Sequence, residues 1–144
     1  MILYCDTSAL IKLYLQEESS TLMLDQAATA SLVVSCRISW AEAIAAMARR
    51  ARETPKDAST IALAQQRFQT QWNHFAIVEV TQTLAELAGN YADTFALRAY
   101  DSVQLAAARI VQESSSDSLQ FACFDARLCK AAKVLGMQVI EKQD

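Results

Sequence analysis

The sequence predicts an α/β fold: a three-layer sandwich whose central, mostly parallel sheet of four to five strands carries helices on both faces. Two observations lead to this prediction. Short apolar runs alternate along the chain with longer segments whose apolar residues have helical spacing. The composition favours helices, since there are only 2 Gly and 1 Pro and Ala, Leu and Gln are abundant. Strands that alternate with helices pair in parallel through right-handed crossovers.

The length and composition predict one domain, residues 1–144, because 144 residues of which 53% are hydrophobic can bury a sizeable core. No stretch approaches the roughly 20 apolar residues that cross a bilayer, and no basic segment precedes an apolar one at the start. We therefore expect a cytoplasmic protein without membrane contact. The net charge of -3 does not exclude nucleic acid, because acids gathered at one site would leave the remainder roughly neutral.

The first half of the chain is predicted to hold two strands and four helices. Residues 2–5 form an apolar run too short for a helix, which favours a strand buried on both faces. A second apolar run, rich in β-branched residues, predicts a strand at 31–36. Pro55 separates the last two helices, because proline disfavours helical geometry in the residue before it. Helical spacing places the four helices at 10–15, 20–30, 43–52 and 56–74.

The second half continues the alternation. Its apolar runs predict strands at 75–80, 119–124 and 137–140. Helices are expected at 81–92, 102–112 and 126–135, with an interruption at 98–101 and a polar loop at 113–118. Gly136 suits the end of the last helix.

Cysteine and histidine do not suggest a site. Cys5, Cys36, Cys123 and Cys129 contain no C-x-x-C pair, so we expect reduced core residues and neither a zinc site nor a disulfide framework. His74 is the one histidine and is predicted to be an ordinary residue near the end of a polar helix.

Four acids stand where predicted strands end or helices begin. Asp6 and Asp125 each follow a strand, Glu42 lies one turn into the helix after the second strand, and Asp101 opens the Ala-rich helix. Each alone has a structural explanation. Aspartate is a strong N-cap, worth about 1 kcal/mol, and the segment from Ser39 to Glu42 matches a capping box.

Together the four acids favour a metal site. They can converge only where adjacent parallel strands end, which is where open α/β sheets bind ligands. Two carboxylates about 4 Å apart repel by about 4 kcal/mol at an effective dielectric of roughly 20, so a cluster must take up protons or bind a cation. Oxygen ligands without His or Cys favour Mg²⁺ or Mn²⁺, and such sites are typical of phosphate chemistry.

The motifs around these acids resemble the PIN domain family, most closely the VapC-type toxins of type II toxin–antitoxin systems. The matching stretches are MILYCDTSALIKLY, SWAEAIAAMARR, LRAYDSVQLAAA and FACFDARLCKAAKVLGM, and they span nearly the whole chain. The resemblance implies a PIN-like sandwich whose catalytic and metal-binding residues are Asp6, Glu42, Asp101 and Asp125. It also implies that Ser8 lies beside the metal.

The same resemblance implies a function. It predicts a Mg²⁺-dependent endoribonuclease, with Mn²⁺ as a possible substitute, that hydrolyses phosphodiester bonds of tRNA or rRNA. It predicts a homodimer and a cognate antitoxin that blocks the site. Cys123 stands where family members often carry Thr or Ser, which would weaken metal binding without abolishing activity. The alternative is a catalytically silent PIN-like module that binds RNA or protein, and such a module is expected to have lost at least one acid.

The basic residues near the acids have two alternative explanations. Arg49, Arg50 and Arg52 either contact RNA phosphates or complement the dipole at the end of their helix. Arg98, three residues before Asp101, is expected to pair with a carboxylate of the cluster or to meet substrate, with the structural role preferred.

Overall fold

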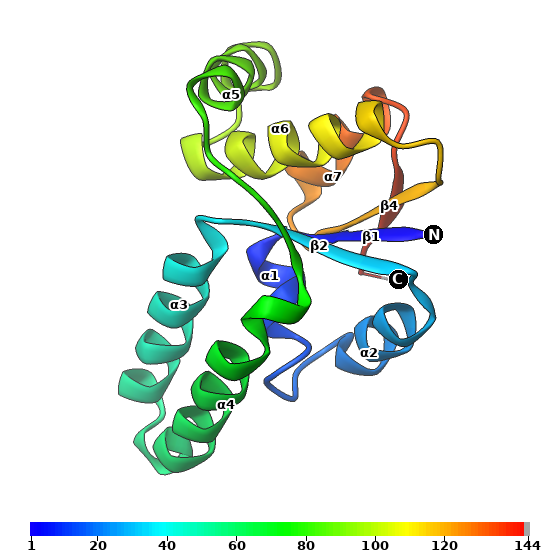
Figure 1. The fold of residues 1–144 in the computed structure, drawn as a ribbon. Helices are drawn as coiled ribbons and strands as arrows, with labels where there is room; N and C mark the ends of the chain where they lie inside the picture. The colour runs from blue at the N-terminus through cyan, green and yellow to red at the C-terminus, as the bar shows by residue number, and fades with distance from the viewer. Residues whose placement is uncertain (143–144) are drawn as a thin grey trace.

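The sheet of this protein has five strands, all parallel, in the order β3-β2-β1-β4-β5. The structure is a computed structural model that describes residues 1–142, and Figure 1 shows the central sheet with its helices. The α/β prediction is confirmed. The strands are β1 (Ile2–Cys5), β2 (Leu32–Cys36), β3 (Ala76–Val78), β4 (Leu119–Ala122) and β5 (Gln138–Ile140).

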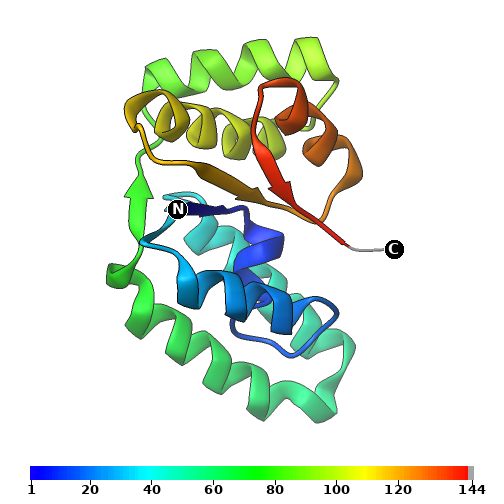
Figure 2. The ribbon, with the colours of Figure 1, turned by 90° about the vertical axis from the view of Figure 1, so that its right-hand side faces the viewer.

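Helices cover both faces of the sheet, as Figure 2 shows from the side. One face carries α1 (Thr7–Ile11), α2 (Ser20–Thr29), α3 (Ser39–Glu53) and α4 (Ala58–Gln71). The other carries α5 (Gln82–Phe95), α6 (Ala99–Ser114) and α7 (Ala126–Val134). Short 3-10 turns, Pro55–Asp57 and Trp72–His74, flank α4. The helices α3 and α4 run side by side and project away from the sheet (Figure 1).

The buried first strand divides the core into two halves. Its side chains alternate between the faces, as those of a strand must. Leu3 and Cys5 pack into the cluster beneath α1 to α4, whereas Ile2 and Tyr4 pack into the cluster beneath α5 to α7. All four are at most 5% exposed, so β1 is the central strand that the apolar run predicts.

The strand order creates a switch point between β1 and β4. From β1 the chain adds β2 and β3 on one side and later returns to add β4 and β5 on the other. The register pairs Cys5 with Ala122, so β1 and β4 end at the same level. Ligands of open α/β sheets bind in the crevice at such a point. Asp6 and Asp125 follow these two strands and therefore stand at the crevice.

Several boundaries differ from those expected. The helix predicted at 10–15 is α1, which begins earlier because Asp6 caps it and which ends at Ile11, followed by a turn. The helix predicted at 102–112 begins at Ala99, since the break with α5 lies at Ala96, whose left-handed φ of 54° ends that helix. The strands predicted at 75–80 and 119–124 are shorter, ending at Val78 and Ala122.

Two cysteines depart from the expectation that all four are reduced. Cys123 follows β4 and Cys129 lies in α7, and they are joined as a disulfide with their Cα atoms 6.2 Å apart. That separation is usual for a disulfide. The chain reverses direction between β4 and α7, and this brings the two cysteines together. Their spacing in the sequence does not predict the pairing. Cys5 and Cys36 are free and buried. Within residues 1–142, no helix is long and apolar enough to span a membrane.

Candidate active site

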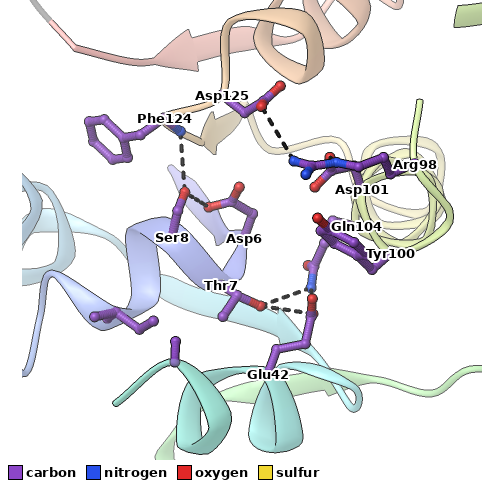
Figure 3. Close-up of a pocket in the computed structure, with 12 residues that line it drawn as sticks. Asp6, Thr7, Ser8, Glu42, Arg98, Tyr100, Asp101, Gln104, Phe124 and Asp125 are labelled. Atoms are coloured by element: carbon purple, nitrogen blue, oxygen red, sulfur yellow. Dashed lines mark hydrogen bonds and ion pairs between the residues drawn. The ribbon is translucent and has the colours of Figure 1, made fainter. Parts of the chain in front are cut away.

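A cavity of about 370 Å³ opens at the carboxyl ends of β1 and β4. The acids singled out in the sequence, Asp6, Glu42, Asp101 and Asp125, all line it. Figure 3 shows that they come from separate parts of the chain and surround a common space. The fold therefore brings acids that lie far apart in the sequence, from Asp6 to Asp125, to one cavity.

Asp6 is the most buried of the four acids, with 5% of its surface exposed. Its Oδ1 accepts hydrogen bonds from the backbone N–H of Ala9 at 2.9 Å and from the Ser8 hydroxyl at 2.7 Å. It thus serves as the N-cap of α1. Ser8 Oγ in turn accepts from the backbone N–H of Phe124 at 3.3 Å, which ties the end of β1 to the segment after β4. Both hydrogen bonds to the side chain of Asp6 within the described chain fall on Oδ1, which leaves Oδ2 for the cavity.

Glu42 does not form the capping box that its spacing from Ser39 suggests. The N-cap of α3 is Ile38, and Ser39 makes no capping hydrogen bond. The side chain of Glu42 points into the cavity instead (Figure 3), where its Oε1 accepts from Thr7 Oγ1 and from Gln104 Nε2, each at 2.9 Å. The carboxylate is therefore held by side chains of the cavity and not by the backbone of its own helix.

Asp101 is not the N-cap of α6, contrary to the structural explanation offered for it. The N-cap is Arg98, and Asp101 lies in the first turn, where an acid also complements the helix dipole. Its Oδ2 is 3.4 Å from Nε of Arg98. Asp125 does cap its helix, accepting from the backbone N–H of Leu128 at 2.9 Å, and its Oδ2 is 3.8 Å from Nη2 of Arg98. One guanidinium thus lies between two of the acids.

Burial makes the carboxyl groups of Asp6, Glu42 and Asp101 hold their protons more tightly. It raises the pKa of Asp6 to about 7, and the nearby Asp101 and Glu42 add to this, while the hydrogen bonds from Ala9 and Ser8 oppose it. Burial also raises the pKa of Glu42 and of Asp101. Arg98 opposes the shift at Asp101 through its positive charge. A cation bound in the cavity would favour the charged forms of these carboxyl groups, because an opposite charge nearby stabilises a carboxylate.

The cavity includes residues that sequence reasoning did not single out. Thr7 and Gln104 hold Glu42, and Tyr100 and Phe124 stand at the rim. Gln104 carried a signal, since it is a polar residue within the apolar, Ala-rich run that follows Asp101.

Other predicted residues lie outside the cavity. Arg49 is exposed on α3 and pairs with Glu53, its Nε 2.9 Å from Oε1. Arg50 pairs with Glu17 at 2.7 Å. Neither lines the space between the acids, and His74 is exposed at the end of the turn after α4.

The donors of the cavity suit a hard cation. No three His, Cys, Asp or Glu side chains in the described part of the chain are close enough together to form a ready ligand set. Mg²⁺ does not require one, because it keeps several waters and is usually held by one or two carboxylates. The four acids supply oxygen donors only, so the residues present fit Mg²⁺ or Mn²⁺ held partly through water.

Comparison of the sequence with models of known protein families shows which family this chain is related to. The sequence model of the PIN domain family matches residues 3–134, nearly the whole chain. The chain belongs to the PIN domain family. The resemblance seen in the sequence motifs is thereby confirmed.

Three relatives similar to this chain over nearly its whole length are named Ribonuclease VapC. Ribonuclease VapC45 of Mycobacterium tuberculosis strain CDC 1551 / Oshkosh is 32% identical over 142 residues, which cover 99% of this chain and 96% of the relative. Ribonuclease VapC49 of strain ATCC 25618 / H37Rv has the same identity and coverage. Ribonuclease VapC46 of that strain is 31% identical over 138 residues, covering 96% of this chain and 95% of the relative.

Solved structures share the PIN domain fold. FitAcB from Neisseria gonorrhoeae has a TM-score of 0.63 at 22% identity, and the match covers 97% of this chain and 96% of the FitAcB chain. VapBC2 from Rickettsia felis, bound to a DNA fragment from its promoter, has a TM-score of 0.63 at 11% identity, covering 99% and 100%. A toxin–antitoxin complex from Klebsiella pneumoniae has a TM-score of 0.61 at 21% identity, covering 87% of each chain.

Proposed function

We propose that this PIN domain protein is a metal-dependent endoribonuclease that acts as the toxin of a toxin–antitoxin pair. The observation that carries the proposal is the gathering of Asp6, Glu42, Asp101 and Asp125 from four elements around one cavity at the switch point of the sheet. Four ionised acids in one cavity are costly for folding unless they take up protons or a cation compensates their charge. The names of the VapC relatives support ribonuclease activity over other phosphodiester chemistry.

Each acid has a part in this proposal. Asp6, Glu42 and Asp101 would hold Mg²⁺, or Mn²⁺ in its place, directly or through water, and Asp125 would complete the set. When bound, the cation would supply an activated water nucleophile and neutralise the charge that develops on the RNA phosphate.

The chain's own groups prepare the site for that chemistry. Ala9 N–H and Ser8 hold one oxygen of Asp6 and keep the other directed at the cavity. Arg98 is 66% exposed at the rim, so it is able to exchange its pairing with Asp101 and Asp125 for a phosphate oxygen once a cation compensates the acids.

The substrate and the protein partners of this ribonuclease are also part of the proposal. We infer that tRNA or rRNA is the substrate, in the cytoplasm, and that a cognate antitoxin covers the cavity of a homodimeric toxin. Two of the structural neighbours, the toxin–antitoxin complex from Klebsiella pneumoniae and VapBC2 from Rickettsia felis, support the antitoxin as partner.

Cleavage of RNA by the purified protein tests the function. Total cellular RNA is incubated with native protein and with Asp6→Asn, each with Mg²⁺ and with EDTA. We expect fragments only with native protein and Mg²⁺, because the substitution keeps the size of the side chain and removes its charge. Asp25→Asn is the matched control, since Asp25 is an exposed aspartate of α2 outside the cavity, and it should cut as native protein does.

The outcomes separate the proposal from its rival. Equal cutting by Asp6→Asn and native protein would exclude this cavity as the nuclease site. RNA binding without cleavage at any Mg²⁺ concentration would favour the silent PIN-like module.

A further inference from the structure

A buried glutamine links the core to one of the four acids. Gln104 lies on α6 and is only 2% exposed. Its Nε2 donates to Glu42 Oε1 and to Ser39 Oγ, each at 2.9 Å, and its Oε1 accepts from the hydroxyl of Tyr4 at 2.6 Å. In Figure 3 its amide points at Glu42 across the cavity wall. The side chain thus connects a strand and two helices.

Tyr4 determines which way the amide faces. The tyrosine is 0% exposed in the middle of β1, and its ring stacks on Phe121 with centroids 5.5 Å apart, so its hydroxyl has a fixed position. A buried hydroxyl needs a hydrogen-bond partner, and the amide oxygen of Gln104 is that partner. Reversing the amide would place its oxygen against the Glu42 carboxylate, two acceptors with no proton between them.

The consequence for Glu42 is a single defined orientation. Gln104 and Thr7 both donate to Oε1 of Glu42, and within the described residues these are its side-chain hydrogen bonds. With Oε1 held on both sides, Oε2 is the oxygen that remains for a cation or its water. Groups that hold a metal-binding carboxylate in place typically change metal affinity by 10 to 100-fold, by the general behaviour of such partners.

We propose that Gln104, aimed by Tyr4, is a positioning residue that orients Glu42 for metal binding at this site. The inference rests on the proposed function, in which Glu42 holds the metal. A merely structural glutamine would stabilise the fold without affecting metal affinity, and this difference makes the inference testable.

Titration of metal-free protein with Mn²⁺ by calorimetry, together with thermal unfolding, is the experiment. Gln104→Met keeps the length of the side chain and removes the amide, and we expect it to weaken Mn²⁺ binding by about 10 to 100-fold. Tyr4→Phe keeps the stacked ring and removes only the hydroxyl, and it should weaken binding in the same direction by a smaller factor.

Gln112→Met is the matched control on the same helix. Gln112 donates to the backbone carbonyl of Leu135 at 3.3 Å and lies outside the cavity. This variant should lower the unfolding temperature while leaving Mn²⁺ affinity within about twofold of native. If Gln104→Met fails to fold, the Tyr4→Phe result decides.

The possible failures are distinguishable. Native affinity in both Gln104→Met and Tyr4→Phe, whatever their unfolding temperatures, would overturn the positioning role and leave the proposed function intact. Absence of Mn²⁺ binding by the native protein would overturn both.

Discussion

Asp6 shows how a single residue can serve both the fold and the site. As an N-cap it stabilises the start of α1 through the Ala9 N–H, and as a buried acid it destabilises the metal-free protein when ionised. The N-cap explanation and the metal explanation considered for this residue are therefore compatible. At Glu42 and Asp101 the structural explanations are wrong, because the residues at the N-cap positions of their helices are Ile38 and Arg98.

The raised pKa of Asp6 predicts a pH dependence of stability. Its pKa is about 7 in the fold and close to 3.8 in the unfolded chain, so between these values the folded protein binds more protons than the unfolded one. The free energy of unfolding of the metal-free protein therefore falls as pH rises from about 4 to about 7. The loss from Asp6 is on the order of 4 kcal/mol, at about 1.4 kcal/mol for each pKa unit.

Urea unfolding between about pH 4 and about pH 8 in EDTA measures this dependence. Asp6→Asn should flatten the decline, because asparagine has no proton to lose, while Asp25→Asn should leave it as in native protein. A decline of the same size in Asp6→Asn would show that Asp6 titrates normally in the fold.

At the scale of elements, the two glycines predict opposite effects of one substitution. Gly136 follows α7 with a φ of +81°, a conformation that costs an alanine roughly 1 kcal/mol. Gly89 lies inside α5, and a Cβ there would meet nothing within 4 Å. Gly136→Ala should therefore destabilise the protein by about 1 kcal/mol, and Gly89→Ala should stabilise it by up to about 1 kcal/mol.

Chemical denaturation of the two variants beside native protein gives both values. Because neither site has a steric obstacle, the backbone conformation alone decides the sign. If Gly136→Ala stabilised the protein, residue 136 would not have a left-handed backbone conformation in solution.

The elements could be predicted from the sequence where local signals act alone. The strand at Ile2–Cys5 and the helix that ends before Gly136 are examples, since an apolar run and a glycine stop are local features. The start of α6 could not be predicted, because the break depends on a left-handed Ala96, a conformation for which alanine carries no signal. The pairing of Cys123 with Cys129 depends on how β4 turns into α7.

At the scale of the molecule, strand order places the site. Alternating strands and helices predict a parallel sheet, but they leave open which strands are neighbours. The observed order sets β1 beside β4, and this brings Asp6 and Asp125 to the same cavity. Asp6 and Asp125 can be recognised in the sequence because they follow apolar runs, and Glu42 and Asp101 because they lie near the starts of predicted helices. The role of Gln104 cannot be recognised in the sequence, because its partners Tyr4 and Glu42 are 100 and 62 residues away.

In the site that we propose, acids from four elements share one cation. Anomalous diffraction from crystals grown with Mn²⁺ tests it most directly, because the signal locates the ion without reference to activity. We predict a peak inside the cavity, contacting Asp6 and Asp101 directly or through ordered water. A map with manganese only elsewhere on the molecule, or with none at all, would contradict the account.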